Sequence, residues 1–301
     1  QVFDTENPAC SVESVPVSVN DRTRFIYEAA CCGLRDFFVK NGYKKACVGV
    51  SGGIDSAVVA CLAVAALGAE NVRGLMMPSQ FSSEGSVEDA KQLAENLGIE
   101  FHVVPITEAY RSIVDTLIPV IGGTDFDATE ENIQSRIRTL MLMALQNKNG
   151  YVLLNCSNKS ENALGICTLY GDTGGAFSVT GDLYKTEMYD LARYINRKFG
   201  APIPENILTK EPSSELRPNQ KDSDMLPSYE VVDAILYRLI EDGQSREEII
   251  NAGFDSDEVQ KIYAMVMRNE KKRFQYPPVL RLSSSSFGHE YRMPLTHKYV
   301  K

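Results

Sequence analysis

The chain has 301 residues, of which 44% are hydrophobic and 24% charged, and this composition excludes collagen-like and wholly disordered proteins. The formal net charge of −9 disfavours general binding to nucleic acid, although a local cluster of N–H groups and basic side chains can still bind a small phosphorylated ligand. No apolar run approaches the roughly 18 residues of a membrane span, so we expect no membrane association.

The first elements in the chain are an arm, a helix, a strand and a second helix. Residues 1–20 are polar, contain two prolines and lack a helical period, so we interpret them as a linker or arm. Residues 22–40 carry an amphipathic helical pattern, and residues 46–50 form a short apolar run typical of a buried strand. An apolar helix is predicted over residues 54–67, and Gly68 ends it.

The alternation of strands and helices continues through the middle of the chain. Strands are predicted at residues 72–77 and 99–104, with a helix at 84–97 between them. A long helix is predicted at 129–147, and a strand follows at 151–154. This order predicts an α/β fold, a doubly wound parallel sheet with helices on both faces.

The last third of the chain predicts a long loop and then a helical C-terminal extension. Residues 210–228 are polar, contain three prolines and show no period, which is typical of a functional loop or of disorder. Helices are predicted at 229–242, 246–252 and 256–274.

The cysteines and histidines show no metal-binding pattern. The seven cysteines form no C-x-x-C motif, and the three histidines are scattered. Several cysteines lie in apolar runs, so we interpret them as reduced core residues of a cytoplasmic protein and expect neither disulfides nor zinc.

The strongest chemical motif is the sequence VSGGIDSA at residues 50–57, between a predicted strand and a predicted helix. Its two glycines permit a tight turn, and its two serines and free N–H groups form a cradle for an anion. Asp55 fits such a cradle if it binds Mg²⁺ together with a polyphosphate. The alternative is a plain glycine turn with a capping serine. No lysine lies in this loop, which disfavours the P-loop machinery of γ-phosphate transfer.

Two further motifs follow the predicted strand at 151–154. Glu161, in the sequence NKSE, is a candidate second Mg²⁺ ligand, because ligands bind at the carboxyl ends of parallel strands. The alternative is a capped, solvated helix start, which this segment alone favours. Lys185, in the sequence GDLYKT, is a candidate phosphate-binding cation, and the alternative is a surface lysine.

The loop at 50–57 resembles the pyrophosphate-binding signature of the N-type ATP pyrophosphatases. The motifs SGGIDSA, NKSE, TLYGDTGG, GDLYKT and KEPSSELRPNQKD, in this order, are similar to the synthetase domain of glutamine-dependent NAD synthetases. The resemblance runs from Tyr27 to the C-terminus and implies one synthetase domain over residues 21–301. It also implies a carbon–nitrogen ligase that converts deamido-NAD to NAD through an adenylated intermediate, with ATP as co-substrate and AMP and pyrophosphate as products.

The same resemblance implies roles at matching positions. Asp55 and Lys185 would be catalytic, and Asp55 and Glu161 would bind Mg²⁺. Contacts to deamido-NAD would come from Asn132, Arg136, Glu161 and Lys272. The residues implied to bind ATP are Gly49, Val50, Ser51, Gly52, Gly53, Ile54, Asp55, Ser56, Cys156, Lys185 and Ser213.

Two positions depart from the family pattern. Cys156 stands where a threonine that contacts ATP is usual, and a thiol is a far weaker hydrogen-bond partner than a hydroxyl. Asn219 stands where an aspartate is common, which puts any catalytic carboxylate at that position in doubt.

The resemblance also implies partners. Glutamine-dependent members carry an N-terminal glutaminase domain, and nothing before Tyr27 supplies one, so we expect this chain to use ammonia. A homodimer is implied as well. Two alternatives remain open: another adenylating amidotransferase domain, such as that of GMP synthetase, and a nucleotide-binding sensor without turnover.

Overall fold

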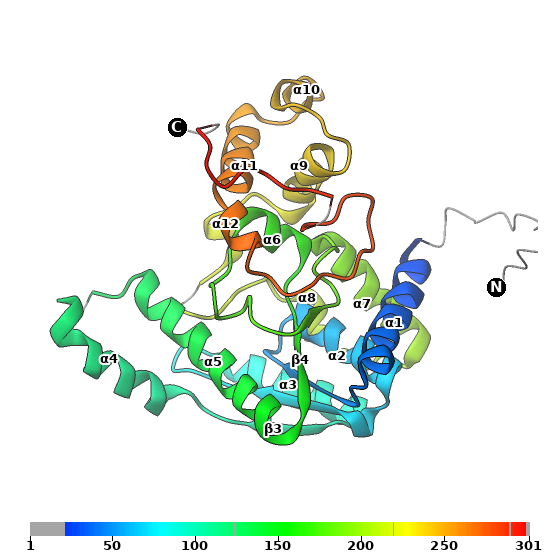
Figure 1. The fold of residues 1–301 in the computed structure, drawn as a ribbon, viewed down its shortest axis with the longest axis vertical. Coiled ribbons are helices and arrows are strands. Elements are labelled where there is room, and N and C mark those ends of the chain that lie inside the picture. Colours follow the sequence, from blue (N-terminus) through cyan, green and yellow to red (C-terminus); the bar gives the residue numbers. More distant parts are fainter. Residues whose placement is uncertain (1–21, 123–124, 219, 289, 299–301) are drawn as a thin grey trace, which may run out of the picture.

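The computed structural model describes residues 22–122, 125–218, 220–288 and 290–298 (Figure 1). The predicted arm at 1–20 and the family departure at Asn219 therefore lie outside the described residues. Within these ranges no helix is long and apolar enough to cross a membrane.

The core of the fold is a five-stranded parallel sheet in the order β3-β2-β1-β4-β5, which confirms the predicted doubly wound α/β architecture. Ala46 pairs with Val72 on one side and with Val152 on the other, so the three central strands end at the same edge of the sheet. The strands are β1 (Lys45–Gly49), β2 (Val72–Met76), β3 (Glu100–Val103), β4 (Tyr151–Asn155) and β5 (Phe177–Ser178).

Helices cover both faces of the sheet, and the residues of β1 show how. Ala46 and Val48 pack into one apolar cluster and Cys47 packs into another, because successive side chains of a strand point to opposite faces. The first cluster contains α1 (Arg22–Asn41), α2 (Ile54–Leu67), α3 (Glu84–Leu97), α7 (Lys185–Phe199) and α8 (Glu205–Thr209). The second contains α4 (Thr107–Ile121) and α5 (Ala128–Asn149).

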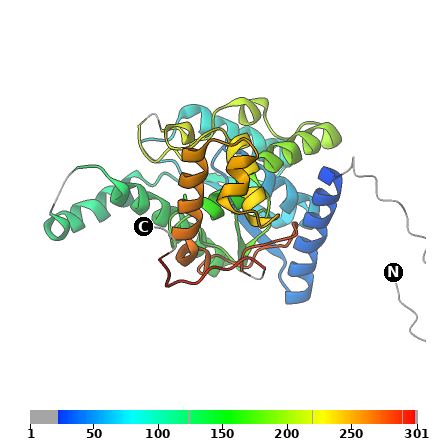
Figure 2. The same ribbon diagram turned by 90° about the horizontal axis from the view of Figure 1, so that it is seen from above.

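A helical lobe lies beyond the carboxyl end of the sheet and has its own apolar cluster (Figures 1 and 2). The predicted helix at 256–274 is divided at Asn269, whose side-chain amide donates to the carbonyl oxygens of Leu164 and Met265. The lobe is made of α6 (Lys159–Leu164), α9 (Tyr229–Ile240), α10 (Arg246–Asn251), α11 (Ser256–Arg268) and α12 (Glu270–Arg273).

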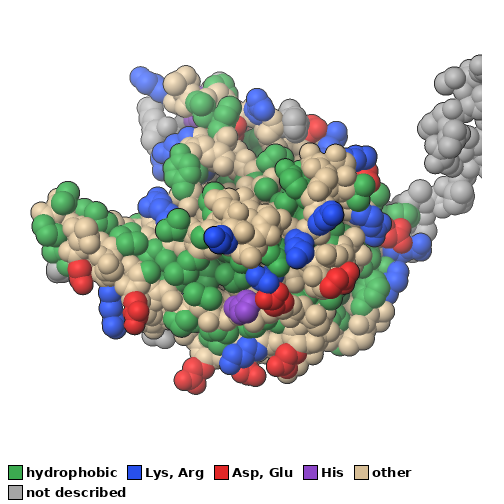
Figure 3. Space-filling model, turned by 60° about the horizontal axis from the view of Figure 1, so that its bottom comes forward, with side chains coloured by type: hydrophobic (Ala, Val, Ile, Leu, Met, Phe, Trp, Pro, Cys, Tyr) green, Lys and Arg blue, Asp and Glu red, His purple; other side chains and the backbone are tan. Residues whose placement is uncertain are grey.

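Two long helices, α4 and α7, were not predicted from the sequence. In α4 only Tyr110 is buried, and Pro119, a residue that disfavours helix interiors, lies in its last turn. Together α4 and the start of α5 project from the body, and apolar side chains gather on this part of the surface (Figures 1 and 3).

Candidate active site

The candidate site lies where the strand order reverses, at the carboxyl ends of β1 and β4. β2, the strand that follows β1 in the chain, lies on one side of β1 within the sheet, and β4 lies on its other side. Ligands bind in the crevice that such a reversal opens in α/β sheets. The turn at residues 50–53 follows β1, and residues 156–158 follow β4, so both predicted motifs meet at this crevice.

The turn after β1 is shaped by Gly52. Its φ is +79°, and an added Cβ would lie 2.2 Å from the Ser86 carbonyl oxygen, so only glycine fits. The Ser51 amide donates to the Ser56 hydroxyl over 3.1 Å, which holds the turn against α2. Gly53 begins α2 without a side-chain cap, so N–H groups of its first turn remain available for an anion.

Three charged side chains meet next to this turn. The Lys185 ammonium group lies 2.6 Å from one Asp55 carboxylate oxygen and 3.4 Å from a Glu161 carboxylate oxygen. The Asn158 amide donates to the other oxygen of Asp55 over 2.9 Å. Only 4% of the Lys185 side chain is exposed, so the interpretation of Lys185 as a surface lysine is wrong.

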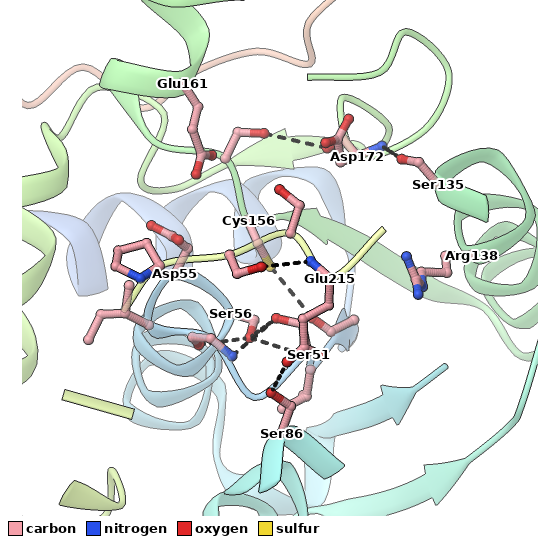
Figure 4. A pocket seen from close by; sticks show the side chains of 18 of the residues that line it. Ser51, Asp55, Ser56, Ser86, Ser135, Arg138, Cys156, Glu161, Asp172 and Glu215 are labelled. Carbon is pink, nitrogen blue, oxygen red and sulfur yellow. Dashed lines mark hydrogen bonds between the residues drawn. The ribbon is translucent and has the colours of Figure 1, made fainter. Parts of the chain in front are cut away.

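Glu161 occupies the first turn of α6 and forms a capping box with Asn158. The helix start is thus capped as the alternative interpretation stated, but Glu161 faces a cavity together with Asp55 (Figure 4). Burial, followed by the neighbouring charge of Asp55, raises the pKa of Glu161 to about 8, against the opposite effect of Lys185. Burial lowers the pKa of Lys185, but the two carboxylates raise it more, so the lysine stays charged.

The cavity has a volume of about 310 Å³ and contains most of the predicted ATP site. All residues predicted to bind ATP line it except Gly52, which shapes the turn behind it. Ser213 reaches it from the loop at 210–228. The residues that line it and were predicted are Gly49, Val50, Ser51, Gly53, Ile54, Asp55, Ser56, Cys156, Glu161, Lys185 and Ser213.

Cys156 lies at the centre of this lining (Figure 4). Its sulfur lies 4.0 Å from the Gly49 carbonyl oxygen and 3.9 Å from that of Leu154, at the limit of a weak hydrogen bond. Burial raises the pKa of its thiol, so it stays protonated near neutral pH. A neutral thiol can line an ATP pocket but gives little polar attraction.

Three residues predicted to contact deamido-NAD lie elsewhere, around residues 165–169. Asn132 accepts a hydrogen bond from the Thr168 hydroxyl, and Arg136 donates to the Leu169 carbonyl oxygen over 3.1 Å. Lys272 donates to the carbonyl oxygens of Gly165 and Cys167. These three side chains, from α5 and α12, hold one segment between them but do not line the cavity.

Several polar residues of the cavity were missed by the sequence analysis, among them Arg138, Asp172 and Asp222. Arg138 donates to the Met77 carbonyl oxygen over 3.0 Å, and burial lowers its pKa to about 10 (Figure 4). The side chain of Asp172 is exposed to the cavity, but the surrounding protein desolvates its carboxylate and raises its pKa to about 6. Asp172 and Asp222 lie within the motifs TLYGDTGG and KEPSSELRPNQKD, but the motifs alone assigned them no role, and only the fold brings all three residues to the site.

The first part of the predicted loop, residues 210–218, is fixed at the cavity by Glu215. Its carboxylate accepts from the Ser83 amide, from the Ser83 hydroxyl over 2.7 Å and from the Ser86 hydroxyl over 2.8 Å, at the start of α3. Glu215 has a φ of +48°, an uncommon conformation for a residue other than glycine. The carboxylate contacts hold the loop in this position despite that strain.

The described part of the chain contains no group of three or more His, Cys, Asp or Glu residues that could hold a metal ion. Asp55 and Glu161 form a smaller oxygen donor set. Mg²⁺ in nucleotide sites is commonly bound by one or two carboxylates, with phosphate oxygens and water completing the shell. Two carboxylates beside an anion cradle therefore fit Mg²⁺ that arrives with a polyphosphate.

The family model described as NAD synthase matches residues 26–276, which include the whole sheet and every helix of the lobe. The chain belongs to the NAD synthase family. A glutamine-dependent NAD(+) synthetase of Aquifex aeolicus is 52% identical over 92% of this chain and 48% of its own length. The chain thus spans about half the length of the curated relatives it matches.

Solved structures show the same relationship. A glutamine-dependent NAD+ synthetase of Acinetobacter baumannii in complex with ADP is 41% identical, with a TM-score of 0.63, over 94% of this chain and 51% of that one. An NH3-dependent NAD synthetase of Campylobacter jejuni with a nitrate ion is 30% identical, with a TM-score of 0.66, over 83% of this chain and 95% of that one.

Proposed function

We propose that this chain catalyses the ATP-dependent amidation of deamido-NAD to NAD, with AMP and pyrophosphate as the other products. The single observation that carries the proposal is the contact of Lys185 with both Asp55 and Glu161 beside the glycine turn. This arrangement places a buried cation and two carboxylates at an anion cradle, as polyphosphate chemistry requires. Membership of the NAD synthase family supports the proposed substrates.

In the proposed complex, the triphosphate of ATP lies along the turn at residues 50–53 and the first turn of α2. The available N–H groups there bind phosphate oxygens, and Lys185 neutralises charge as pyrophosphate leaves. Ser213 and Arg138 line the same cavity, and we propose that they contact the rest of the nucleotide. The ADP complex of the Acinetobacter relative is in keeping with an adenine nucleotide at this site.

Mg²⁺ is proposed as the cofactor, held by Asp55 and Glu161. When bound, the ion would stabilise negative charge on the polyphosphate as a Lewis acid. Burial, followed by the charge of Asp55, raises the pKa of Glu161 to about 8, and a cation bound by both carboxylates would favour the ionised form of Glu161. The two carboxylates beside the anion cradle are the structural reason for expecting a cation at the site.

The proposed reaction has two steps, adenylation and amidation. An oxygen of the nicotinate carboxylate bonds to the α-phosphorus of ATP, and the bond from that phosphorus to the bridging oxygen breaks to release pyrophosphate. Ammonia then attacks the activated carbonyl carbon, the bond to AMP breaks, and one proton is released. Asp172 is placed to accept this proton, because its pKa of about 6 leaves it ionised at pH 7.5 and it lines the cavity.

The loop at 210–228 is proposed to exclude water from the adenylate. Glu215 connects this loop to Ser83 and Ser86 across the mouth of the cavity. Water that reached the adenylate would return it to free carboxylate and waste ATP. Opening of the loop is then needed to admit the substrates and release the products.

Deamido-NAD is proposed to lie against residues 165–169, where Asn132, Arg136 and Lys272 converge. The two basic side chains suit the phosphates or the carboxylate of this dinucleotide. Glu161 lines the ATP cavity and lies four residues before this segment, so it is proposed to contact both substrates.

The proposed nitrogen source for these 301 residues is ammonia. The relatives named glutamine-dependent are about twice as long, so their glutaminase activity would reside in the part this chain does not match. The Campylobacter relative, which this chain covers almost completely, is named NH3-dependent. We also propose a homodimer, with the exposed apolar residues Ile118, Val120 and Ile121 of α4 in its interface, and a cytoplasmic location, since the described cysteines are free.

The deciding experiment is the dependence of pyrophosphate release on the acceptor. With ATP and Mg²⁺, deamido-NAD should trigger release, whereas xanthosine monophosphate and nicotinate mononucleotide should not. Release triggered by xanthosine monophosphate would support a GMP synthetase-like activity instead. ATP binding without release under any acceptor would support the nucleotide sensor.

A further inference from the structure

Lys159, the first residue of α6, has no exposed surface. Its ammonium nitrogen lies 2.8 Å from an Asp182 carboxylate oxygen, 2.7 Å from the Ser283 hydroxyl and 2.9 Å from the Ser285 carbonyl oxygen. It also donates to a carboxylate oxygen of Glu241. Because desolvation offsets most of the attraction within a buried ion network, stability alone does not explain this arrangement.

The two carboxylates around Lys159 also hold the backbone of residues 282–285. Asp182 accepts from the N–H groups of Leu282 and Ser283, both over 2.7 Å. Glu241 accepts from the N–H group of Ser285 over 2.9 Å. Residues 282–285 belong to no helix or strand and lie beyond residue 276, where the family match ends (red in Figure 1). This C-terminal segment is therefore held in place by the network around Lys159.

On its other side, Lys159 is joined to the candidate site through its own helix. The preceding residue, Asn158, donates to Asp55 over 2.9 Å. Two residues after Lys159, Glu161 faces the cavity. A displacement of the Lys159 backbone would therefore move one partner of Asp55 and one wall of the cavity together.

The network also reaches the start of α7. The Lys159 amide donates to the Leu183 carbonyl oxygen over 2.7 Å. Asp182 precedes Lys185 by three residues, and the Lys185 amide donates to the Ser160 hydroxyl over 2.9 Å. The relative position of α6 and α7 thus sets the distance between Glu161 and Lys185.

We propose that Lys159 is a positioning residue that uses the C-terminal segment, residues 282–285, to fix α6 and α7 at the site. Its ammonium group touches no substrate in this account. It keeps Asn158, Glu161 and Lys185 aligned with Asp55. The kinetic readout of this inference rests on the proposed function, whereas its hydrogen-exchange readout does not.

The first test compares Ser283, within the segment, with Ser286, the residue directly after it. Ser283→Ala removes a hydroxyl that contacts both Lys159 and Asp182, without leaving a charge unpaired. Ser286→Ala removes a hydroxyl whose one hydrogen-bond partner among the described residues is Glu290, and it serves as the matched control. Ser283→Ala should increase deuterium uptake at residues 157–165 and lower kcat about threefold with little change in KM. Ser283→Thr, which restores the hydroxyl, should recover both properties, and Ser286→Ala should change neither.

The second test removes the whole network. Lys159→Met alone would leave two buried carboxylates unpaired and could unfold the chain, so it is combined with Asp182→Asn and Glu241→Gln. The folded triple variant should lose about tenfold or more in kcat, while the KM for ATP changes less than about threefold. A folded triple variant with the parental kcat and parental exchange at 157–165 would overturn the proposal. If the triple variant does not fold, the serine pair decides, and equal exchange in Ser283→Ala and Ser286→Ala rejects it.

The two proposals fail in different ways. A parental chain that makes no NAD and releases no pyrophosphate refutes the proposed function. The exchange comparison of Ser283→Ala with Ser286→Ala requires no turnover, so it still decides whether the C-terminal segment supports α6.

Discussion

The side-chain amide of Asn158 donates a hydrogen bond of 2.9 Å to the carboxylate of Asp55, although 103 residues separate them. The bond joins the turn after β1 to the helix start after β4 across the point where the strand order reverses. It leaves the second oxygen of Asp55 to Lys185, 2.6 Å away. Asp55 is thereby held at the mouth of the anion cradle, and the first prediction tests what it does there.

Asp55→Asn should abolish adenylation and spare the fold. The amide oxygen of the new side chain can still accept the hydrogen bond from Asn158, but the amide carries no charge for a metal ion. Losing a metal ligand removes several kcal/mol of transition-state stabilisation. Acceptor-dependent pyrophosphate release measures the effect, and the thermal unfolding midpoint measures the fold. The matched control is Asp36→Asn, which alters an exposed carboxylate paired with Lys40. Near-normal release by Asp55→Asn at saturating Mg²⁺ would refute the metal role.

Arg136 and Arg138 should separate the two substrate sites. Arg136→Ala should raise the KM for deamido-NAD about tenfold or more and leave ATP binding nearly unchanged, as expected for one lost charge-assisted hydrogen bond. Arg138→Ala should do the reverse, because Arg138 lines the ATP cavity and Arg136 does not. Initial rates with each substrate varied in turn provide both constants. The assignment is wrong if Arg136→Ala weakens ATP and leaves the dinucleotide constant unchanged.

The pH dependence of stability should reveal Glu161. Its native pKa of about 8 lies above the value of about 4.3 for an unfolded chain, so the native state binds more protons between these values. The free energy of unfolding therefore falls as pH rises through this window. Glu161→Gln cannot lose a proton at this position. The unfolding midpoint of this variant minus that of the parent, measured without ligands, should therefore be larger at pH 8 than at pH 5. An equal midpoint difference at both pH values would contradict the raised pKa.

The nitrogen source provides a further prediction. The purified 301-residue chain should make NAD from ammonium and fail with glutamine. Neutral ammonia is the nucleophile, and ammonium releases more of it as pH rises towards about 9, so the rate at fixed total ammonium should increase over that range. Glutamine-supported synthesis after enzymatic removal of contaminating ammonia would reveal a glutaminase activity within these residues.

Local sequence signals predicted the parts of the site that depend on neighbouring residues. The turn at 50–53 follows an apolar strand and contains Gly52, whose positive φ and close approach to Ser86 require glycine. The alternating strands and helices similarly determined the fold class, because each parallel strand needs a crossover helix.

Contacts between distant segments could not be read in the same way. Lys185 and Asp55 are 130 residues apart, and no spacing rule joins them. Asp172 belongs to an irregular segment and Asp222 to a single 3-10 turn, and neither has a period that shows which side chains face inward. Arg138 lies two residues from Arg136 on the same helix, and only the packing of α5 on the sheet shows that it lines the cavity.

The central claim is tested most directly by following the atoms of the proposed reaction. The chain is incubated with ATP, Mg²⁺, deamido-NAD and ¹⁵N-labelled ammonium, and the products are identified by mass spectrometry and ³¹P NMR. We predict NAD with one ¹⁵N atom in its carboxamide group, together with AMP and pyrophosphate in equal amounts. Formation of ADP and phosphate in place of AMP and pyrophosphate, or of AMP without labelled NAD, would contradict the account.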